Sequence, residues 1–411
     1  MTNGMTLDDY PRYLVRASQA DHRLIERLLT PGLWTPGLPL EGIVLDAAQA
    51  DRLGEPLQAN PLKAALADRP IQILVDHQVY RLVDGQHRVP ALARPPYSRK
   101  TLVYDGDDRG YSPSDFSDRR FVTRFVQTVF DYQSRLGVTD YTAPAFFVSA
   151  TDSAWISVNE FLRRESVQQA GTFLYGTICV NLRAVSQEMF DSLARDQVSG
   201  VYVLVSPFNA TKASVGKLLR FTELLNELRR RRLNIVAARQ PAFGLVQLAL
   251  DIAGFDSGIA QSEGFDFPSL MRRAKQPNMR GQGSGRARRV YFGDLLTSLS
   301  PSLANRILAQ PGLRSSFACS GPCCRERLSD AVLSARDHFL WGRMKEIQEM
   351  RAIAPSLRPR FLANKLSRAA QLSKKVLRAF PDESLDFSHL ANWSSALEAT
   401  ASVVSGKERR P

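Results

Sequence analysis

The chain has 411 residues, 44% of them hydrophobic, and its mean hydropathy of −0.22 is that of a soluble globular protein. No apolar run is long enough to cross a bilayer, and the N-terminus lacks an apolar signal segment. We therefore expect neither a membrane partner nor export, and a cytoplasmic location follows. The formal charge of +13 favours a polyanionic partner such as nucleic acid.

Eight short apolar runs, rich in β-branched residues, are predicted strands. Near-continuous hydrophobicity of this kind is typical of parallel strands that are covered on both faces. Helical patterns separate the runs, including apolar stripes over 121–130 and 215–228. The predicted strands are 42–46, 71–76, 143–149, 173–180, 200–206, 233–238, 254–257 and 290–294.

This order of elements predicts an α/β fold, a (β/α)8 TIM-like barrel over residues 36–310. A doubly wound sheet is the alternative, but no Gly-x-Gly-x-x-Gly follows any predicted strand. Residues 1–35 are then a lead-in to the barrel. Residues 311–411 are predicted to form a basic, helical extension that carries a Cys/His metal site.

Catalytic side chains of such barrels gather where the strands end. Among the polar residues at the predicted strand ends, we select Asp76 and Asp256 as a carboxylate pair, because both end strongly apolar strands. Ser206, Arg239 and Gln240 are predicted substrate contacts at the same face. The alternative for any single acid is a helix N-cap or a turn aspartate.

Two segments without acids concentrate the positive charge. Residues 271–289 and 355–378 each contain seven Lys or Arg residues, and the first includes Arg280 and Arg286. Such segments attract phosphates through counterion release, so we expect both to contact nucleic acid, with Arg280 and Arg286 among the binding residues. A solvated basic surface is the alternative.

A five-residue stretch, Asp84-Gly-Gln-His-Arg88, matches the DGQHR motif. It resembles a family of DNA-modification-associated proteins with a nucleotide-binding fold. Asp-Gly is also an ordinary turn signal after a strand. A DGQHR-type, DNA-modification-associated protein is therefore kept as an alternative.

Three of the four cysteines, Cys319, Cys323 and Cys324, lie within six positions around a Gly-Pro turn, and His338 follows on a predicted helix. Thiolates and one imidazole can hold Zn²⁺ in a closed, structural site. Buried thiols that pack as small hydrophobic groups are the alternative. A disulfide framework is not expected from so few cysteines.

The order of a barrel, the stretch Gly254-Phe255-Asp256, a basic Gly-rich loop, the cysteine cluster and the helix with His338 resembles the tRNA-guanine transglycosylases. The resemblance covers about residues 40–380 and extends to relatives that modify DNA bases. It implies that Asp256 is a covalent nucleophile and that Asp76 serves in acid/base chemistry or base recognition. It also implies a structural zinc on Cys319, Cys323, Cys324 and His338.

The resemblance predicts an enzyme that exchanges a nucleobase in tRNA or DNA. The Ser-Gly-Gly that follows the family's early aspartate is absent after Asp76, and Ala238–Gly244 replaces a Gly-rich loop. These departures favour a second hypothesis, a non-catalytic relative that binds nucleic acid or a partner protein. An unrelated barrel enzyme for a small anionic substrate is a third, and the sequence is compatible with a homodimer.

Overall fold

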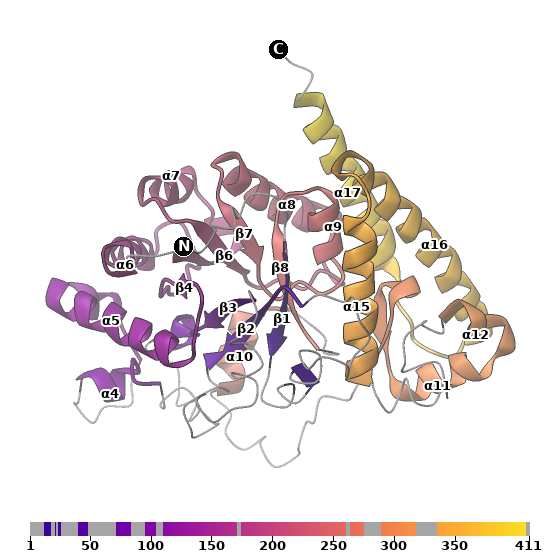
Figure 1. The fold of residues 1–411 in the computed structure, drawn as a ribbon, viewed down its shortest axis with the longest axis horizontal. Coiled ribbons are helices and arrows are strands. Elements are labelled where there is room, and N and C mark those ends of the chain that lie inside the picture. Colours follow the sequence, from indigo (N-terminus) through magenta and orange to yellow (C-terminus); the bar gives the residue numbers. More distant parts are fainter. Residues whose placement is uncertain are drawn as a thin grey trace, which may run out of the picture.

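The structure, a computed structural model, describes residues 12–17, 21, 24–25, 40–47, 71–83, 95–103, 110–170, 174–259, 264–274, 289–317 and 335–407. Eight parallel strands form a nearly closed, barrel-shaped sheet at its centre (Figure 1). They are β1 Tyr13–Ala17, β2 Gly42–Asp46, β3 Gln72–Asp76, β4 Tyr141–Thr142, β5 Leu174–Val180, β6 Gly200–Val205, β7 Asn234–Ala237 and β8 Gly254–Gly258.

The strands follow one another around the barrel in chain order. The sheet runs β3-β2-β1-β8-β7-β6-β5-β4, so β8 pairs with β1 and the two ends of the sheet are β3 and β4. The gap between those ends is bridged beside the short β4. Thr139 N–H donates to Ile73 O at 3.2 Å, and Thr142 Oγ1 donates to Val75 O at 2.8 Å. The predicted TIM-like barrel is therefore confirmed as an architecture.

Six strands, β2, β3 and β5–β8, lie where the apolar runs predicted them. The fourth strand is shorter and earlier than predicted. Within 143–149 only Val148 forms a bridge, to Val180, and Pro144 has no N–H for a ladder.

The eighth predicted strand was wrong. Val290–Phe292 is β9, which pairs antiparallel with β10, Thr297–Leu299, in a separate hairpin. The barrel strand that the prediction lacked is β1, within the residues assigned to a lead-in. The eight barrel strands therefore run from Tyr13 to Gly258 rather than from 36 to 310.

Most of the helices cover the outside of the barrel (Figure 1), but Phe267 and Met271, in the helix that follows β8, pack with Leu14, Val44 and Leu74 in the barrel interior. The main α-helices are α4 Arg99–Val103, α5 Arg119–Arg135, α6 Trp155–Ala170, α7 Gln187–Arg195, α8 Val215–Arg230, α9 Gly244–Ala249 and α10 Phe267–Ala274. The C-terminal part adds α11 Pro301–Ala309, α12 Pro311–Phe317, α15 Ala335–Arg351, α16 Arg358–Ala379 and α17 Ser388–Lys407. Short 3-10 turns include η4 Val79–Arg81 and η8 Gly293–Leu295. Over the described residues, no helix is both long and apolar enough to span a membrane.

The C-terminal helices share the main hydrophobic core with the barrel. Trp393 of α17 is fully buried, and its Nε1 donates to Ala210 O in the loop after β6 at 3.0 Å. His338 of α15 is also buried, and its Nε2 contacts Tyr291 O of β9 at 2.8 Å. The extension is therefore packed onto the barrel rather than tethered to it.

Alternation along the strands sets up the polar end of the barrel. Leu14, Val44 and Leu74 belong to a second, smaller core cluster to which six strands contribute. Side chains two positions apart on a strand point to the same side, so Arg16, Asp46 and Asp76 extend this interior layer towards the strand ends.

Candidate active site at the barrel mouth

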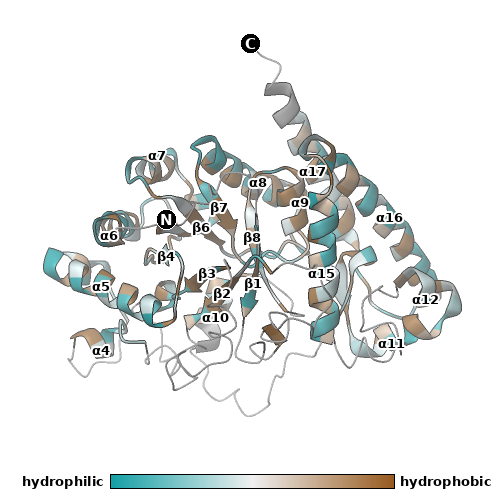
Figure 2. Ribbon diagram, viewed as in Figure 1, coloured by the Kyte–Doolittle hydropathy of each residue, from teal (hydrophilic) through white to brown (hydrophobic). Residues whose placement is uncertain are grey.

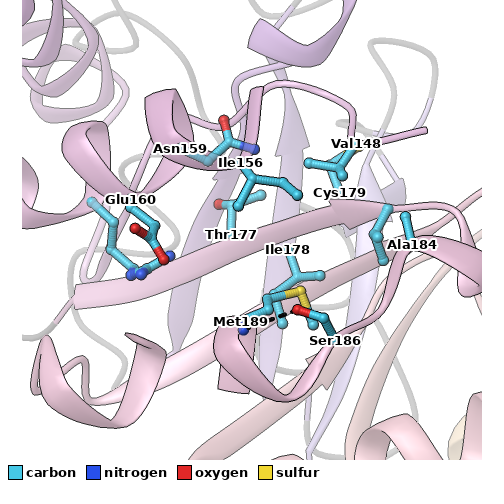
Figure 3. A pocket seen from close by; sticks show the side chains of 12 residues that line it. Val148, Ile156, Asn159, Glu160, Thr177, Ile178, Cys179, Ala184, Ser186 and Met189 are labelled. Atoms are coloured by element: carbon cyan, nitrogen blue, oxygen red, sulfur yellow. Dashed lines mark hydrogen bonds between the residues drawn. The ribbon is translucent and has the colours of Figure 1, made fainter. Parts of the chain in front are cut away.

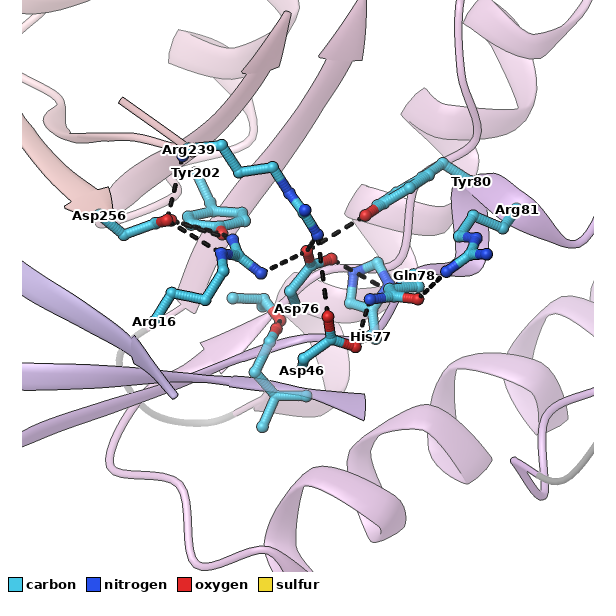
Figure 4. A network of polar contacts seen from close by, with 12 residues as sticks. Arg16, Asp46, Asp76, His77, Gln78, Tyr80, Arg81, Tyr202, Arg239 and Asp256 are labelled. Atoms are coloured by element: carbon cyan, nitrogen blue, oxygen red, sulfur yellow. Dashed lines mark hydrogen bonds and ion pairs between the residues drawn. The ribbon is translucent and has the colours of Figure 1, made fainter. Parts of the chain in front are cut away.

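Asp76, the last residue of β3, and Asp256, in the middle of β8 rather than at its end, bind the same guanidinium group (Figure 4). Arg16 of β1 donates through Nη1 to Asp76 Oδ2 at 2.8 Å and through Nε to Asp256 Oδ1 at 3.0 Å. A further bond joins its Nη2 to Asp256 Oδ2 at 3.1 Å. The two acids selected from the sequence therefore lie in one network at the C-terminal end of the barrel.

Asp256 is enclosed by donors. Besides Arg16, the Tyr202 hydroxyl donates to Oδ2 at 2.7 Å and the Arg239 backbone N–H donates to Oδ1 at 3.0 Å. The residue is fully buried, and each carboxylate oxygen accepts two hydrogen bonds. All the usual lone-pair positions of the carboxylate are therefore occupied in this conformation.

Asp76 and Asp46 are direct neighbours in the β2–β3 register, yet their environments differ. Burial alone would raise the pKa of Asp76, but the guanidinium groups of Arg16 and Arg239 outweigh it and lower the pKa to about 2. For Asp46, burial dominates and raises the pKa, with Arg239 opposing and the Asp76 charge adding to the rise. Neighbouring carboxyl groups with oppositely shifted pKa values suit separate acid and base roles.

Exposure distinguishes the two acids further. The Asp46 side chain is 14% exposed and that of Asp76 only 1%, while Arg239 above them is 22% exposed. Arg239 Nη2 donates to Asp76 Oδ2 at 3.1 Å and lies 3.9 Å from Asp46 Oδ2. Asp46 and Arg239 are thus the charged groups of this network that a substrate would meet first.

The backbone at the mouth is held in an unusual conformation at two positions. Gln78 and Arg239 have φ values of 57° and 56°, a left-handed region that non-glycine residues rarely adopt. Both make side-chain contacts to the acids, and Gln78 Nε2 donates to Asp46. Such strained positions cluster at functional sites.

His77 is a structural residue in this network. Its Nδ1 accepts from Val79 N–H at 3.2 Å, so its Nε2 carries the proton and donates to Ala143 O at 3.0 Å. Burial lowers the pKa of His77, although Asp76 opposes the shift. The neutral ring fixes the turn after β3 rather than serving as an acid.

Two of the predicted substrate contacts have internal partners. Ser206 is fully buried and accepts from Phe267 N–H, and Gln240 is buried and donates to Ala238 O. Of the three residues predicted at the strand ends, only Arg239 reaches the acids. Arg280, Arg286, Cys319, Cys323, Cys324 and the stretch 84–88 lie outside the described residues.

The sequence did not single out Arg16, Tyr202 or the distinct role of Asp46. The arginine inside the apolar run Tyr13–Ala17 was the one sign of this network in the sequence, because an isolated charge in an apolar strand needs a partner. Tyr202 has no such signal, since a tyrosine in a strand is ordinary.

Among the described residues, hollows also lie away from the mouth, and two of them are enclosed enough to compare with a ligand site. The first, about 40 Å³, lies beside β5 next to α6 and α7 and is lined by groups such as Ile156, Ile178 and Met189 (Figure 3). It has room for a few waters rather than a nucleotide. The second, about 410 Å³, lies where α15 and α17 meet the β9–β10 hairpin, and it combines Lys212 and Arg289 with Asp386. Its mixed charges select no ligand class.

Comparisons with known proteins do not assign the chain to a family. In the described part of the chain, no group of three or more His, Cys, Asp or Glu side chains is arranged to hold a metal ion. No protein-family model matches the sequence, and no curated protein is significantly similar to it.

Proposed function

We propose that the chain is a nucleobase-exchange enzyme that acts on tRNA or DNA at the barrel mouth. The observation that supports this is the pair Asp76 and Asp256, brought together on Arg16, with a third acid, Asp46, beside Asp76. Exchange by double displacement needs a carboxylate that attacks the sugar and a second acid that manages the proton on the base. The mouth offers both, at the face where barrel enzymes carry their chemistry.

In this proposal Asp256 is the nucleophile. One of its oxygens forms a bond to the anomeric carbon while the bond from that carbon to the base breaks, and an incoming base then displaces the carboxylate. The target base has to leave its stack to enter the mouth. Attack also requires Asp256 to release one of its four hydrogen bonds, two of which come from Arg16, one from Tyr202 and one from the backbone N–H of Arg239.

Asp46 serves as the acid that protonates the leaving base, and its carboxylate then takes the proton that the incoming base loses. Its raised pKa favours the protonated form, whereas Asp76, with a pKa of about 2, stays ionised beside the developing positive charge on the sugar. Both roles depend on the two arginines, which lie closer to Asp76 than to Asp46.

The test is incorporation of a radiolabelled purine into tRNA or duplex DNA. We expect Asp256→Asn to reduce incorporation by roughly 1000-fold or more, because an amide cannot form the intermediate. The matched control is Asp140→Asn, an acid just before β4 at the opposite end of the barrel, which should exchange normally. Equal rates for the Asp256→Asn variant and the unmutated protein would contradict the proposal.

The complete enclosure of Asp256 favours a second candidate, a barrel that binds nucleic acid without chemistry. Here Arg16, Tyr202 and the acids would close the barrel end as a purely structural network. This candidate predicts nucleic-acid binding in the absence of incorporation of any purine, so the same assay separates the two.

A structural zinc on Cys319, Cys323, Cys324 and His338 is also proposed. His338 Nε2 contacts the Tyr291 carbonyl and so carries the proton, which means that Nδ1 would have to bind the metal. Thiolates hold zinc in closed sites that stabilise the fold. We expect about one zinc per chain by metal analysis, and its loss in Cys319→Ser. Absence of zinc from the unmutated protein would leave buried thiols as the explanation.

A further inference from the structure

α16 presents a continuous basic face to solvent. At 100° per residue, its exposed polar and charged positions span about 120° of the helix circumference, and the exposed Leu377 lies to one side of them. Five of them are cations, and α16 contains no Asp or Glu. We call this set the α16 basic face; it consists of Arg360, Asn364, Ser367, Arg368, Gln371, Lys374, Lys375 and Arg378.

The opposite side of α16 is used for packing. Leu362, Leu366 and Val376 are buried in the main core, and α16 packs against α17 and α9. In Figure 2 hydrophilic residues follow the outer side of this helix. Most of the apolar surface that a membrane-binding helix would insert into lipid is therefore covered, and Leu377, 37% exposed, is the exception.

The five cations differ from the other basic residues of the helix. Arg358 forms an ion pair with Asp251, and Lys365 with Glu346 and Glu349. Within the part of the chain that the structure describes, no ion pair involves the cations of the α16 basic face. Arg368 opposes the rise that burial causes in the pKa of Asp294, so its charge is partly engaged within the protein, and the other four are available to an external anion.

The geometry of the face fits a phosphate backbone. From Arg360 to Arg378 the helix extends about 27 Å, at 1.5 Å per residue. One strand of a duplex presents a phosphate about every 3.4 Å along its axis, so several lie within reach of the five cations. The face carries no aromatic side chain, whereas single-strand binders stack bases on aromatic residues.

We propose that the α16 basic face binds the backbone of double-helical nucleic acid, without reading its sequence. This proposal extends the proposed function. It rests on that function only for the kind of nucleic acid, tRNA or DNA, on which the mouth acts. The double-helical part of the substrate is held at α16, and the mouth takes a single base. Duplex binding is measured without any base exchange, so this proposal can hold even if the proposed base exchange is not observed.

The experiment is fluorescence anisotropy of a labelled duplex at several NaCl concentrations. Five phosphate contacts predict a slope of log K against log salt of about −4.5. The variant Arg368→Gln/Lys374→Gln/Lys375→Gln should reduce the magnitude of that slope by about 2.7 and weaken binding about 100-fold near physiological salt. Its circular dichroism should match that of the unmutated protein, because the three side chains are exposed.

The matched control removes the same charge elsewhere. Arg119, Arg120 and Arg124 are exposed on α5, at the other end of the molecule in Figure 1. Their triple replacement by Gln should leave the slope unchanged. Equal loss in both variants would show that net charge alone drives binding and would overturn the proposal. So would tighter binding of a single strand than of a duplex, or equal capture by phosphatidylserine vesicles.

Discussion

Arg16→Met is expected to lower the free energy of unfolding by about 3 to 5 kcal/mol, since breaking a buried ion pair leaves an uncompensated charge. Arg16 is 9% exposed and holds two carboxylates that are almost completely buried. Methionine fills a similar space but donates nothing to Asp76 or Asp256. Urea unfolding followed by circular dichroism measures the loss.

A double variant separates the charge effect from a packing effect. Arg16→Met/Asp256→Asn removes one of the stranded carboxylates, so part of the lost stability should return. If Arg16→Met alone costs less than about 1 kcal/mol, as an exposed ion pair would, the buried network is not what stabilises the barrel mouth. If the double variant is less stable than the single one, the stranded charge is not the cause of the loss.

Asp46→Asn is expected to slow base exchange by about 100- to 10,000-fold, the usual contribution of a general acid. An acid works only while protonated, so the rate of the unmutated protein should fall as the pH rises through the raised pKa of Asp46. That dependence should vanish in the variant, because an amide does not titrate in this range. Initial rates of purine incorporation across the pH range measure both effects.

The leaving base supplies the control for Asp46. A substrate whose base leaves readily without protonation should lose far less rate on the Asp46→Asn change than one whose base needs a proton. An equal loss for both substrates would assign Asp46 a merely structural role. A rate that kept its alkaline decline in the variant would place the titrating group elsewhere.

The barrel could be predicted where strands are apolar on both faces. β5 and β6 are buried along their whole length, and a run of that kind is visible in the sequence. β1 is just as buried, but Arg16 interrupts its apolar run. The apolar run at 290–292 was wrongly predicted to be a barrel strand. It is buried because it packs against α15, not because it belongs to the barrel sheet.

Asp46 and Asp76 could be predicted from their positions at strand ends, and Asp256 was predicted from a strand that in fact continues to Gly258. The partners of these acids could not be predicted. Arg16 and Asp256 are 240 residues apart in the chain, and only the closure of β1 against β8 brings them together. The sequence also gives no reason to separate Asp46 from Asp76, since both end a strand with the same pattern. Their pKa values diverge because Arg16 and Arg239 bind Asp76 more closely.

A covalent adduct on Asp256 is the most direct evidence for base exchange at the mouth. The unmutated protein is mixed with tRNA or duplex DNA without free base, denatured, digested and analysed by mass spectrometry. We expect a nucleic-acid fragment attached to the peptide that contains Asp256, and its release when a purine is added before denaturation. A protein that binds the duplex through α16 yet yields no adduct on Asp256 would contradict the account.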